Sequence, residues 1–216
     1  MNFYYSDDQK NLITAISNSI KNFDDNYWLK CDNEATFPHD FVKTLANGGW
    51  LGIAMPEKYG GSNLGVTEAA LMMMIIAEKG GMTAASSVHM NIFGPSALVK
   101  FASEKQKLKW LPKIISGETK MCFAVTEPDT GLDTTRLKAK AVKKNDHYII
   151  NGRKIWTSTA QITNKIMIIA RTSERNDKNP TQGLSLFYTD FNRDYIEARV
   201  IHKMGRAAVD SNELFI

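Results

Sequence analysis

The sequence predicts an α+β protein in which a helical half precedes a half built of strands. Apolar residues recur at helical spacing up to about residue 119, and from about residue 120 they alternate with polar residues as in half-buried strands. A block of helices followed by a block of strands is typical of segregated domains, because a parallel α/β sheet needs the two kinds of element to alternate. We therefore expect a helical bundle domain over residues 1–119 and a β-domain over residues 120–216.

The first two predicted helices are marked by their caps. Ser6 and Gln9 resemble a capping box at the start of the first predicted helix, which carries apolar residues at helical spacing: Leu12, Ile13, Ile16 and Ile20. Pro38 suits the first turn of the second helix, and the Gly48-Gly49 pair ends it.

The third predicted helix is the most apolar segment of the chain. Residues 66–79, VTEAALMMMIIAEK, are apolar on nearly every side, so we expect a helix buried on all faces at the centre of a bundle, ending at Gly80-Gly81. A further helix over residues 85–102 is interrupted at Gly94-Pro95. A short helix that begins near residue 104 is expected to end before Pro112.

From residue 120 the pattern predicts an antiparallel β-barrel or sandwich. Asn151-Gly152 is a tight-turn pair between two alternating segments, so it predicts a hairpin. The predicted strands cover residues 121–126, 136–144, 147–151, 153–156, 165–171, 183–190, 195–201 and 212–216. The chain stops at Ile216 inside a predicted strand, which would leave an unpaired sheet edge, so we expect this chain to be a piece of something longer.

Composition excludes several classes of function. The net charge of +4 comes from 27 basic and 23 acidic residues, and the lysines at 105–109 and 138–144 have no interleaved aromatic residues for base stacking. The two cysteines, Cys31 and Cys122, form neither a disulfide framework nor a metal-ligand spacing, so no metal site is expected. The N-terminus lacks the pattern of a secretory signal, and the longest apolar run, residues 69–77, is too short to span a bilayer. We expect a cytoplasmic protein that binds neither nucleic acid nor membrane.

Two polar segments carry the chemistry. The loop AVTEPDTGLDTTRL, residues 124–137, offers hydroxyls and backbone N–H groups that suit a phosphate or a ring carbonyl, although alone it predicts only a turn. In NGRKIWTSTAQ, residues 151–161, Trp156 stands beside Thr157 and Ser158, and alone such a ring is more often part of a core. The glycine patterns of dinucleotide-binding and P-loop proteins are absent from the sequence.

Together these segments closely resemble the acyl-CoA dehydrogenase family. MCFAVTEPDTGLD resembles its flavin-loop signature and YIINGRKIWTSTAQ its tryptophan strand, and LGIAMPEKYGG, the segment from residue 89 to 118 and HKMGRAAVDSNELF extend the resemblance over nearly the whole chain. The resemblance implies an FAD enzyme that removes the α-proton and β-hydride of an acyl-CoA thioester, giving a trans-2-enoyl-CoA, and passes electrons to an electron-transfer flavoprotein. It also implies a homotetramer or homodimer, and a C-terminal four-helix domain before which this chain is cut.

The resemblance assigns residues to both ligands. Those that match flavin-binding positions are Phe123, Val125, Thr126, Gly131, Leu132, Trp156, Thr157 and Ser158. Those that match substrate-binding positions are Leu132, Ser86, His89 and Phe93. Many members have Ser where this chain has Leu132, so a match there rests on backbone geometry alone. His89 suits a hydrogen-bonded packing role as well as contact with the acyl group.

Glu127 is a carboxylate inside the loop and suggests a catalytic base, but the resemblance places the general base outside these motifs, beyond Ile216. We therefore expect Glu127 to pair with a basic side chain or to order the loop, and we assign no catalytic residue within the chain. Lacking a positioned base, the chain alone is expected to lose about 10²–10⁴-fold in rate at that step. The alternatives are a non-catalytic module that binds acyl-CoA or a partner, and a flavoenzyme of another kind, an acyl-CoA oxidase or a monooxygenase.

Overall fold

The computed structural model describes residues 4–216, and these residues form two compact units. The helical unit comprises the residues up to 120 together with 203–209, and the β-unit comprises 121–202 and 210–216. Segment 203–209 thus belongs with the helices although strands flank it in the sequence. The fold class predicted from the sequence, helices first and a β-rich region second, is confirmed.

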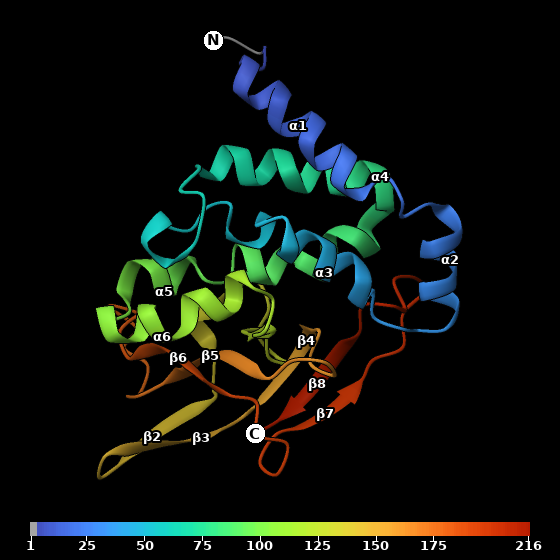
Figure 1. Cartoon of the computed structure of the whole chain (residues 1–216). Helices are drawn as coiled ribbons and strands as arrows, with labels where there is room; N and C mark the ends of the chain where they lie inside the picture. Colours follow the sequence, from blue (N-terminus) through green and yellow to red (C-terminus); the bar gives the residue numbers. More distant parts are fainter. Residues whose placement is uncertain (1–3) are drawn as a thin grey trace. The chain divides into compact units, whose positions relative to one another are not determined.

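The helical unit holds six α-helices within the described residues (Figure 1). The Ser6–Gln9 capping box is formed as predicted, and Ser103 caps a later helix in the same way. The α-helices are α1 Asp7–Ile20, α2 Asp25–Asn33, α3 His39–Asn47, α4 Val66–Ile92, α5 Ser96–Phe101 and α6 Glu104–Ile115, with short 3₁₀ turns η1 Trp50–Gly52 and η2 Glu57–Tyr59.

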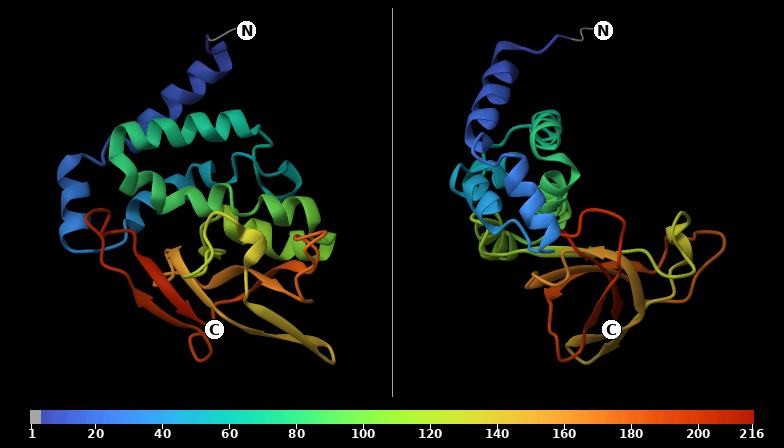
Figure 2. Two further views of the ribbon diagram at one scale, coloured as in Figure 1. Left: turned by 180° about the vertical axis from the view of Figure 1, so that it is seen from behind. Right: turned by 90° about the vertical axis from the view of Figure 1, so that its right-hand side faces the viewer.

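Helix α4 runs through the predicted stop at Gly80-Gly81, but its axis bends there. Gly81 has φ 65°, a left-handed backbone that glycine adopts without a steric penalty, so two helical arms meet at this residue. Figure 2 shows both arms in its two views. Met72 is fully buried, whereas Met74 is 46% exposed, so the expectation of a helix buried on all faces is wrong. The first arm packs against α1 and leaves one side open.

The helices differ from the prediction in two further respects. Helix α2 was not predicted, because its nine residues present only Trp28 and Cys31 as buried side chains. Helix α6 was predicted to end before Pro112 but continues to Ile115. Pro112 cannot donate to the carbonyl of Leu108, and since Leu108 lies on the exposed side of the helix, water can hydrogen-bond that carbonyl instead.

The β-unit contains two sheets (Figure 1). One has the order β1-β5-β2-β3 with β6 also paired to β5, and the other has the order β4-β8-β7. The strands are β1 Met121–Ala124, β2 Lys140–Lys144, β3 His147–Asn151, β4 Arg153–Ser158, β5 Lys165–Arg171, β6 Leu184–Asp190, β7 Glu197–Val200 and β8 Ser211–Phe215. Strand β5 pairs in parallel with β1 and with β2, so the sheet is mixed where the sequence predicted an antiparallel one. Alternation of side chains does not report strand direction, and the long segments between these strands permit parallel crossovers.

The Asn151-Gly152 pair does not form the predicted hairpin. Strand β3 pairs with β2, whereas β4 pairs with β8, so Gly152 carries the chain from one sheet to the other. A Cβ at Gly152 would lie 2.5 Å from the Cβ of Ala139, and this close approach is the reason for glycine here. The expected unpaired edge at the chain end is also wrong, because β8 lies between β4 and β7.

The helices were also compared with the length and hydropathy that a membrane span requires. None of those within residues 4–216 is both long and apolar enough to cross a bilayer.

Candidate functional site

The two segments singled out in the sequence lie side by side in the β-unit. The backbone N–H of Ile155 in β4 donates to the carbonyl of Thr126 at 2.9 Å, just after β1 ends. The loop that follows β1 and the strand that carries Trp156 are therefore joined at the residues where the sequence places a cofactor wall.

A buried lysine holds the two segments together. Lys154 has no exposed surface, and its Nζ donates to the carbonyls of Val125 at 2.9 Å and Ile169 at 2.8 Å and to Glu127 Oε1 at 2.9 Å. All three N–H groups of the ammonium are therefore used. Burial lowers the pKa of Lys154, and the adjacent Glu127 carboxylate acts in the opposite direction.

Glu127 is the matching buried carboxylate, only 6% exposed. Besides Lys154, its oxygens accept the backbone N–H groups of Lys138 at 2.6 Å and Ala139 at 2.9 Å. The prediction that Glu127 pairs with a basic side chain is confirmed. Because both oxygens are engaged inside the protein, Glu127 is not presented to a substrate as a base would be.

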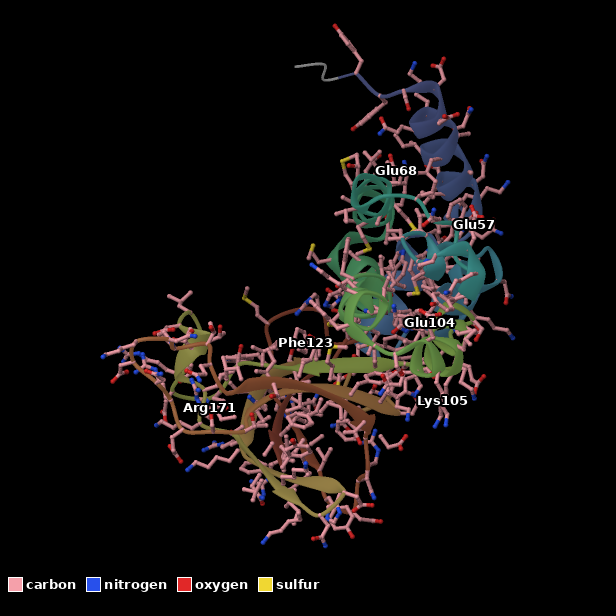
Figure 3. All side chains as sticks on the ribbon, turned by 90° about the vertical axis from the view of Figure 1, so that its left-hand side faces the viewer. Glu57, Glu68, Glu104, Lys105, Phe123 and Arg171 are labelled. Atoms are coloured by element: carbon pink, nitrogen blue, oxygen red, sulfur yellow. The ribbon has the colours of Figure 1, made fainter. Side chains whose placement is uncertain are left out.

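Arg171, at the end of β5, holds the far side of the same loop. Its guanidinium is buried and donates to the carbonyls of Leu137 at 2.9 Å and of Thr135, and also to the carbonyls of Gln182 at 3.2 Å and Pro180 at 3.1 Å. Figure 3 labels Arg171 among the stick side chains of the β-unit. Two buried cations, Lys154 and Arg171, thus fix the loop 125–139 through its carbonyl groups.

The tip of this loop is left open. Gly131 and Leu132 are exposed, and within the described part of the chain the backbone N–H groups of residues 131–134 donate to no acceptor. Asp133 then caps the short 3₁₀ turn η3, Thr134–Arg136, by accepting from the N–H of Thr135. A run of free N–H groups on an anchored loop suits an anion such as a phosphate.

Trp156 projects from an irregular point of β4. The pairing with β8 shifts register between Lys154 and Thr157, and Trp156, inside this bulge, has φ 62°. A left-handed backbone is unusual for a bulky residue and costs on the order of 1–3 kcal/mol. The bulge leaves the indole 57% exposed, whereas Thr157 is buried with its Oγ1 lacking a hydrogen-bond partner among the described residues, and Ser158 is half-buried.

The remaining predicted flavin residues lie on β1 and directly after it. Phe123 and Val125 are half-buried and alternate with Cys122 and Ala124, which belong to the core of the β-unit. Thr126 follows and is half-buried. Figure 3 labels Phe123 on this strand. An exposed ring on a strained bulge, a buried hydroxyl without a partner and a row of free N–H groups together fit a ligand that has both a flat ring and phosphates, as FAD does.

Three of the four predicted substrate residues lie in the helical unit, on the second arm of α4 and at its C-cap, and the fourth, Leu132, lies at the loop tip in the β-unit. Ser86, His89 and Phe93 are spaced so that they share one face of a helix. His89 Nδ1 lies 2.9 Å from the carbonyl of Ser86, and because a carbonyl oxygen only accepts, Nδ1 carries the proton. Burial lowers the pKa of His89, and nearby Arg206 acts in the same direction.

Sequence reasoning missed three cations at these places: Lys154, Arg171 and Arg206. Lys154 precedes Trp156 by two residues in an alternating strand, but alternation alone gives no signal that this lysine is buried. The sequence likewise gives no signal for Arg171. Arg206 lies in segment 203–209, which is part of the sequence that resembles the family, but no function was assigned to that segment from the sequence. Among residues 4–216, no cluster of three or more metal-ligating side chains is present.

Comparison with protein families gives two adjacent matches. The model described as the acyl-CoA dehydrogenase N-terminal domain matches residues 6–118, and that of the acyl-CoA dehydrogenase middle domain matches residues 122–216.

Individual relatives are consistent with this match. Mitochondrial isovaleryl-CoA dehydrogenase of Bos taurus is 40% identical over 141 residues, which is 65% of this chain and 33% of the relative. A solved glutaryl-coenzyme A dehydrogenase in complex with glutaryl-CoA has a TM-score of 0.91 and 29% identity, covering 100% of this chain and 55% of that one. The FAD complex of PigA has a TM-score of 0.89 over 100% of this chain and 56% of that one, and at 24% identity it shows the shared fold alone. The chain spans between a third and just over half of the length of these relatives.

Proposed function

The chain belongs to the acyl-CoA dehydrogenase family, and on that premise we propose that it supplies the helical and β parts of an FAD-dependent enzyme that oxidises an acyl-CoA thioester to a trans-2-enoyl-CoA. One observation carries the proposal. The loop 125–139 and the Trp156 strand, far apart in the sequence, are joined by Lys154, Glu127 and the Ile155–Thr126 hydrogen bond. The site they form has the ring, the hydroxyls and the free N–H groups that FAD requires.

We assign the cofactor contacts as follows. Trp156 would pack on the ring system together with Phe123 and Val125, and the free N–H groups around Gly131 and Leu132 would hold the pyrophosphate. When bound, FAD would supply the acceptor for the hydride removed from the β-carbon of the acyl group.

The hydroxyls of this chain then act as preorganised donors. Thr157 is almost fully buried and its Oγ1 has no hydrogen-bond partner among residues 4–216, while Ser158 and Thr126 are half-buried, so these three hydroxyls are the proposed donors to a ring edge. Donors that are fixed before reaction stabilise negative charge without reorganisation. The anchored loop holds Thr126 in place, because its neighbours Val125 and Glu127 are both bonded to Lys154.

The rest of the proposal concerns the general base, the electron acceptor, the assembly and the acyl group. We place the general base outside residues 4–216, since Glu127 is engaged by Lys154 and two backbone N–H groups. An electron-transfer flavoprotein is the proposed electron acceptor, and a homotetramer or homodimer is the proposed assembly. Ser86, His89 and Phe93 are the proposed contacts for the acyl group, and Leu132 contributes through its backbone.

The test uses the full-length protein that contains this chain, purified with its flavin. We expect a yellow protein that reduces an artificial electron acceptor only when an acyl-CoA is added. A colourless protein that takes up no added FAD contradicts the proposal. Steady peroxide formation in air with acyl-CoA, without any need for an acceptor, would instead identify an acyl-CoA oxidase.

A further inference from the structure

Arg206 lies beside the proposed acyl-binding residues of α4. Its Nη1 donates to the Oγ of Ser86, across 120 positions of sequence but within the helical unit. Burial of Ser86 to 4% exposure makes this hydroxyl a fixed anchor for the guanidinium. Arg206 is half-buried, so its hydrogen bond to Ser86 is partly shielded from water.

The backbone that presents Arg206 is strained and held in place. Arg206 has φ 56°, a left-handed conformation that is uncommon for a long side chain. Lys203 Nζ donates to the carbonyls of Arg206 at 3.1 Å and Val209 at 2.5 Å, and the N–H of Ala208 donates to Asp32 Oδ1 at 3.1 Å. Strain that is maintained by so many contacts is characteristic of functional positions.

Arg206 lacks a countercharge among the described residues. No carboxylate within residues 4–216 lies within 4.0 Å of its guanidinium, and Ser86 is its one side-chain partner there. The arginines that do pair with carboxylates are Arg136, Arg153, Arg175 and Arg199. The buried Arg171 instead donates to four carbonyls. A partly desolvated guanidinium with most of its five N–H donors unused is suited to an incoming anion.

His89 adds no positive charge to this cluster near neutral pH. Burial lowers the pKa of its imidazole below the ordinary 6.5, and its Nδ1–H is committed to the carbonyl of Ser86. Arg206 therefore carries the charge of the cluster by itself. Phe93 is 39% exposed and lies one helical turn beyond His89, so it supplies apolar surface next to His89.

From this arrangement we propose that Arg206, anchored by Ser86, binds a carboxylate at the distal end of the acyl group, so that the preferred substrates are dicarboxylyl-CoA thioesters. This inference rests on the proposed function, because it takes Ser86, His89 and Phe93 as contacts of the acyl chain. A planar guanidinium matches a carboxylate with two parallel hydrogen bonds, and such charged bonds discriminate strongly against a methyl group.

The test compares substrates of equal chain length on the full-length, flavin-loaded protein. Hexanoyl-CoA and adipoyl-CoA differ only in the distal methyl or carboxylate group, and octanoyl-CoA and suberoyl-CoA repeat the comparison two carbons longer. We expect the wild type to favour the carboxylate member of each pair in kcat/KM. Arg206→Gln should lower that preference about 10- to 100-fold, chiefly through KM, because charged hydrogen bonds are lost. Arg199→Gln, which removes an exposed arginine of β7, is the matched control and should leave the preference unchanged.

A second variant and a binding measurement keep the outcomes separate. Ser86→Ala leaves the backbone contacts of segment 203–209 intact and should lower the preference in the same direction by a smaller factor. Calorimetric binding of adipoyl-CoA and hexanoyl-CoA to the same proteins gives the preference without turnover. A selective loss of adipoyl-CoA binding in Arg206→Gln supports the inference even if no acyl-CoA is oxidised, in which case only the proposed function fails. Equal losses for both thioesters, or a wild type that prefers hexanoyl-CoA, overturn it.

Discussion

At the scale of single residues, the β-unit depends on one buried ion pair. Lys154 and Glu127 are each almost fully enclosed, and between them they make five hydrogen bonds to one another and to the backbone. Burying two charges is costly unless every donor and acceptor is used, and here they are. Removing one partner therefore leaves an uncompensated charge in the interior.

This predicts a large asymmetry between buried and surface pairs. Lys154→Met and Glu127→Gln should each lower the free energy of unfolding by about 3–5 kcal/mol, and the double variant by less than the sum of the two. Arg153→Met, which breaks the more exposed pair with Glu213, should cost less than about 1 kcal/mol. Urea unfolding of the four variants measures this, and additive losses would show that the pair does not act as a unit.

Trp156 combines backbone strain with an exposed ring, and two substitutions separate these properties. Trp156→Ala and Trp156→Gly should both weaken FAD binding roughly tenfold, because either removes the stacking surface. Glycine accepts φ 62° without a steric penalty, so Trp156→Gly should be more stable than Trp156→Ala by about 1 kcal/mol. Flavin titration and thermal unfolding give the two readouts. Tyr195→Ala, at a residue 78% exposed in the β-unit, is the control and should retain normal flavin affinity. Unchanged affinity in both Trp156 variants would remove the indole from the site.

At the scale of elements, regular patterns were predicted well and irregular ones were not. The caps at Ser6, the interruption at Gly94-Pro95 and all eight strand segments follow from local spacing, which the sequence displays directly. The pairing of β3 with β2 rather than β4 does not, because a two-residue turn signal is equally compatible with a crossover between sheets. Strand direction and the continuation of α6 through Pro112 also depend on tertiary surroundings, which local spacing does not report.

The candidate site likewise contains parts that the sequence predicts and parts that it does not. The loop and the Trp156 strand were recognisable as motifs, but regular alternation puts Lys154 and Trp156 on the same face of β4. The bulge separates them, turning Lys154 into the core and Trp156 outward. Alternation alone cannot reveal such a bulge, which is why a buried lysine was not predicted. Arg206 escaped prediction because its partner Ser86 is 120 residues away.

The crossover from β3 to β4 leads to a prediction about Gly152. A methyl group there would lie 2.5 Å from the Cβ of Ala139 and 2.9 Å from its Cα, and the N–H of Ala139 is one of the donors to Glu127. Gly152→Ala should therefore displace the loop and destabilise the protein by about 1–3 kcal/mol, with weaker FAD binding. Gly205→Ala, where an added Cβ meets nothing within 4 Å, is the control for stability. If Gly152→Ala were as stable as Gly205→Ala, the close approach to Ala139 would not constrain the loop.

At the scale of the whole molecule, the histidines whose pKa is lowered both belong to the helical unit. His39 and His89 both lie in the helical unit: burial lowers the pKa of the half-buried His89 below 6.5, and partial desolvation together with Lys120 lowers the pKa of the more exposed His39. The β-unit contains His147 and His202, and both are exposed. The units should therefore respond differently to mild acid.

The direction of this response follows from proton linkage. A histidine whose pKa is lowered by folding binds its proton less readily in the native state than in the unfolded chain. Below pH 6.5 the unfolded chain takes up protons first, so stability that is fully present above pH 6.5 is lost as the pH falls towards the lowered values. Between pH 7 and pH 5, hydrogen exchange should therefore reveal increased opening of the helical unit before that of the β-unit. A His39→Gln/His89→Gln variant should lose most of this pH dependence, whereas His147→Gln should retain it. Equal opening of both units, or an undiminished effect in the double variant, would assign the acid sensitivity to other groups.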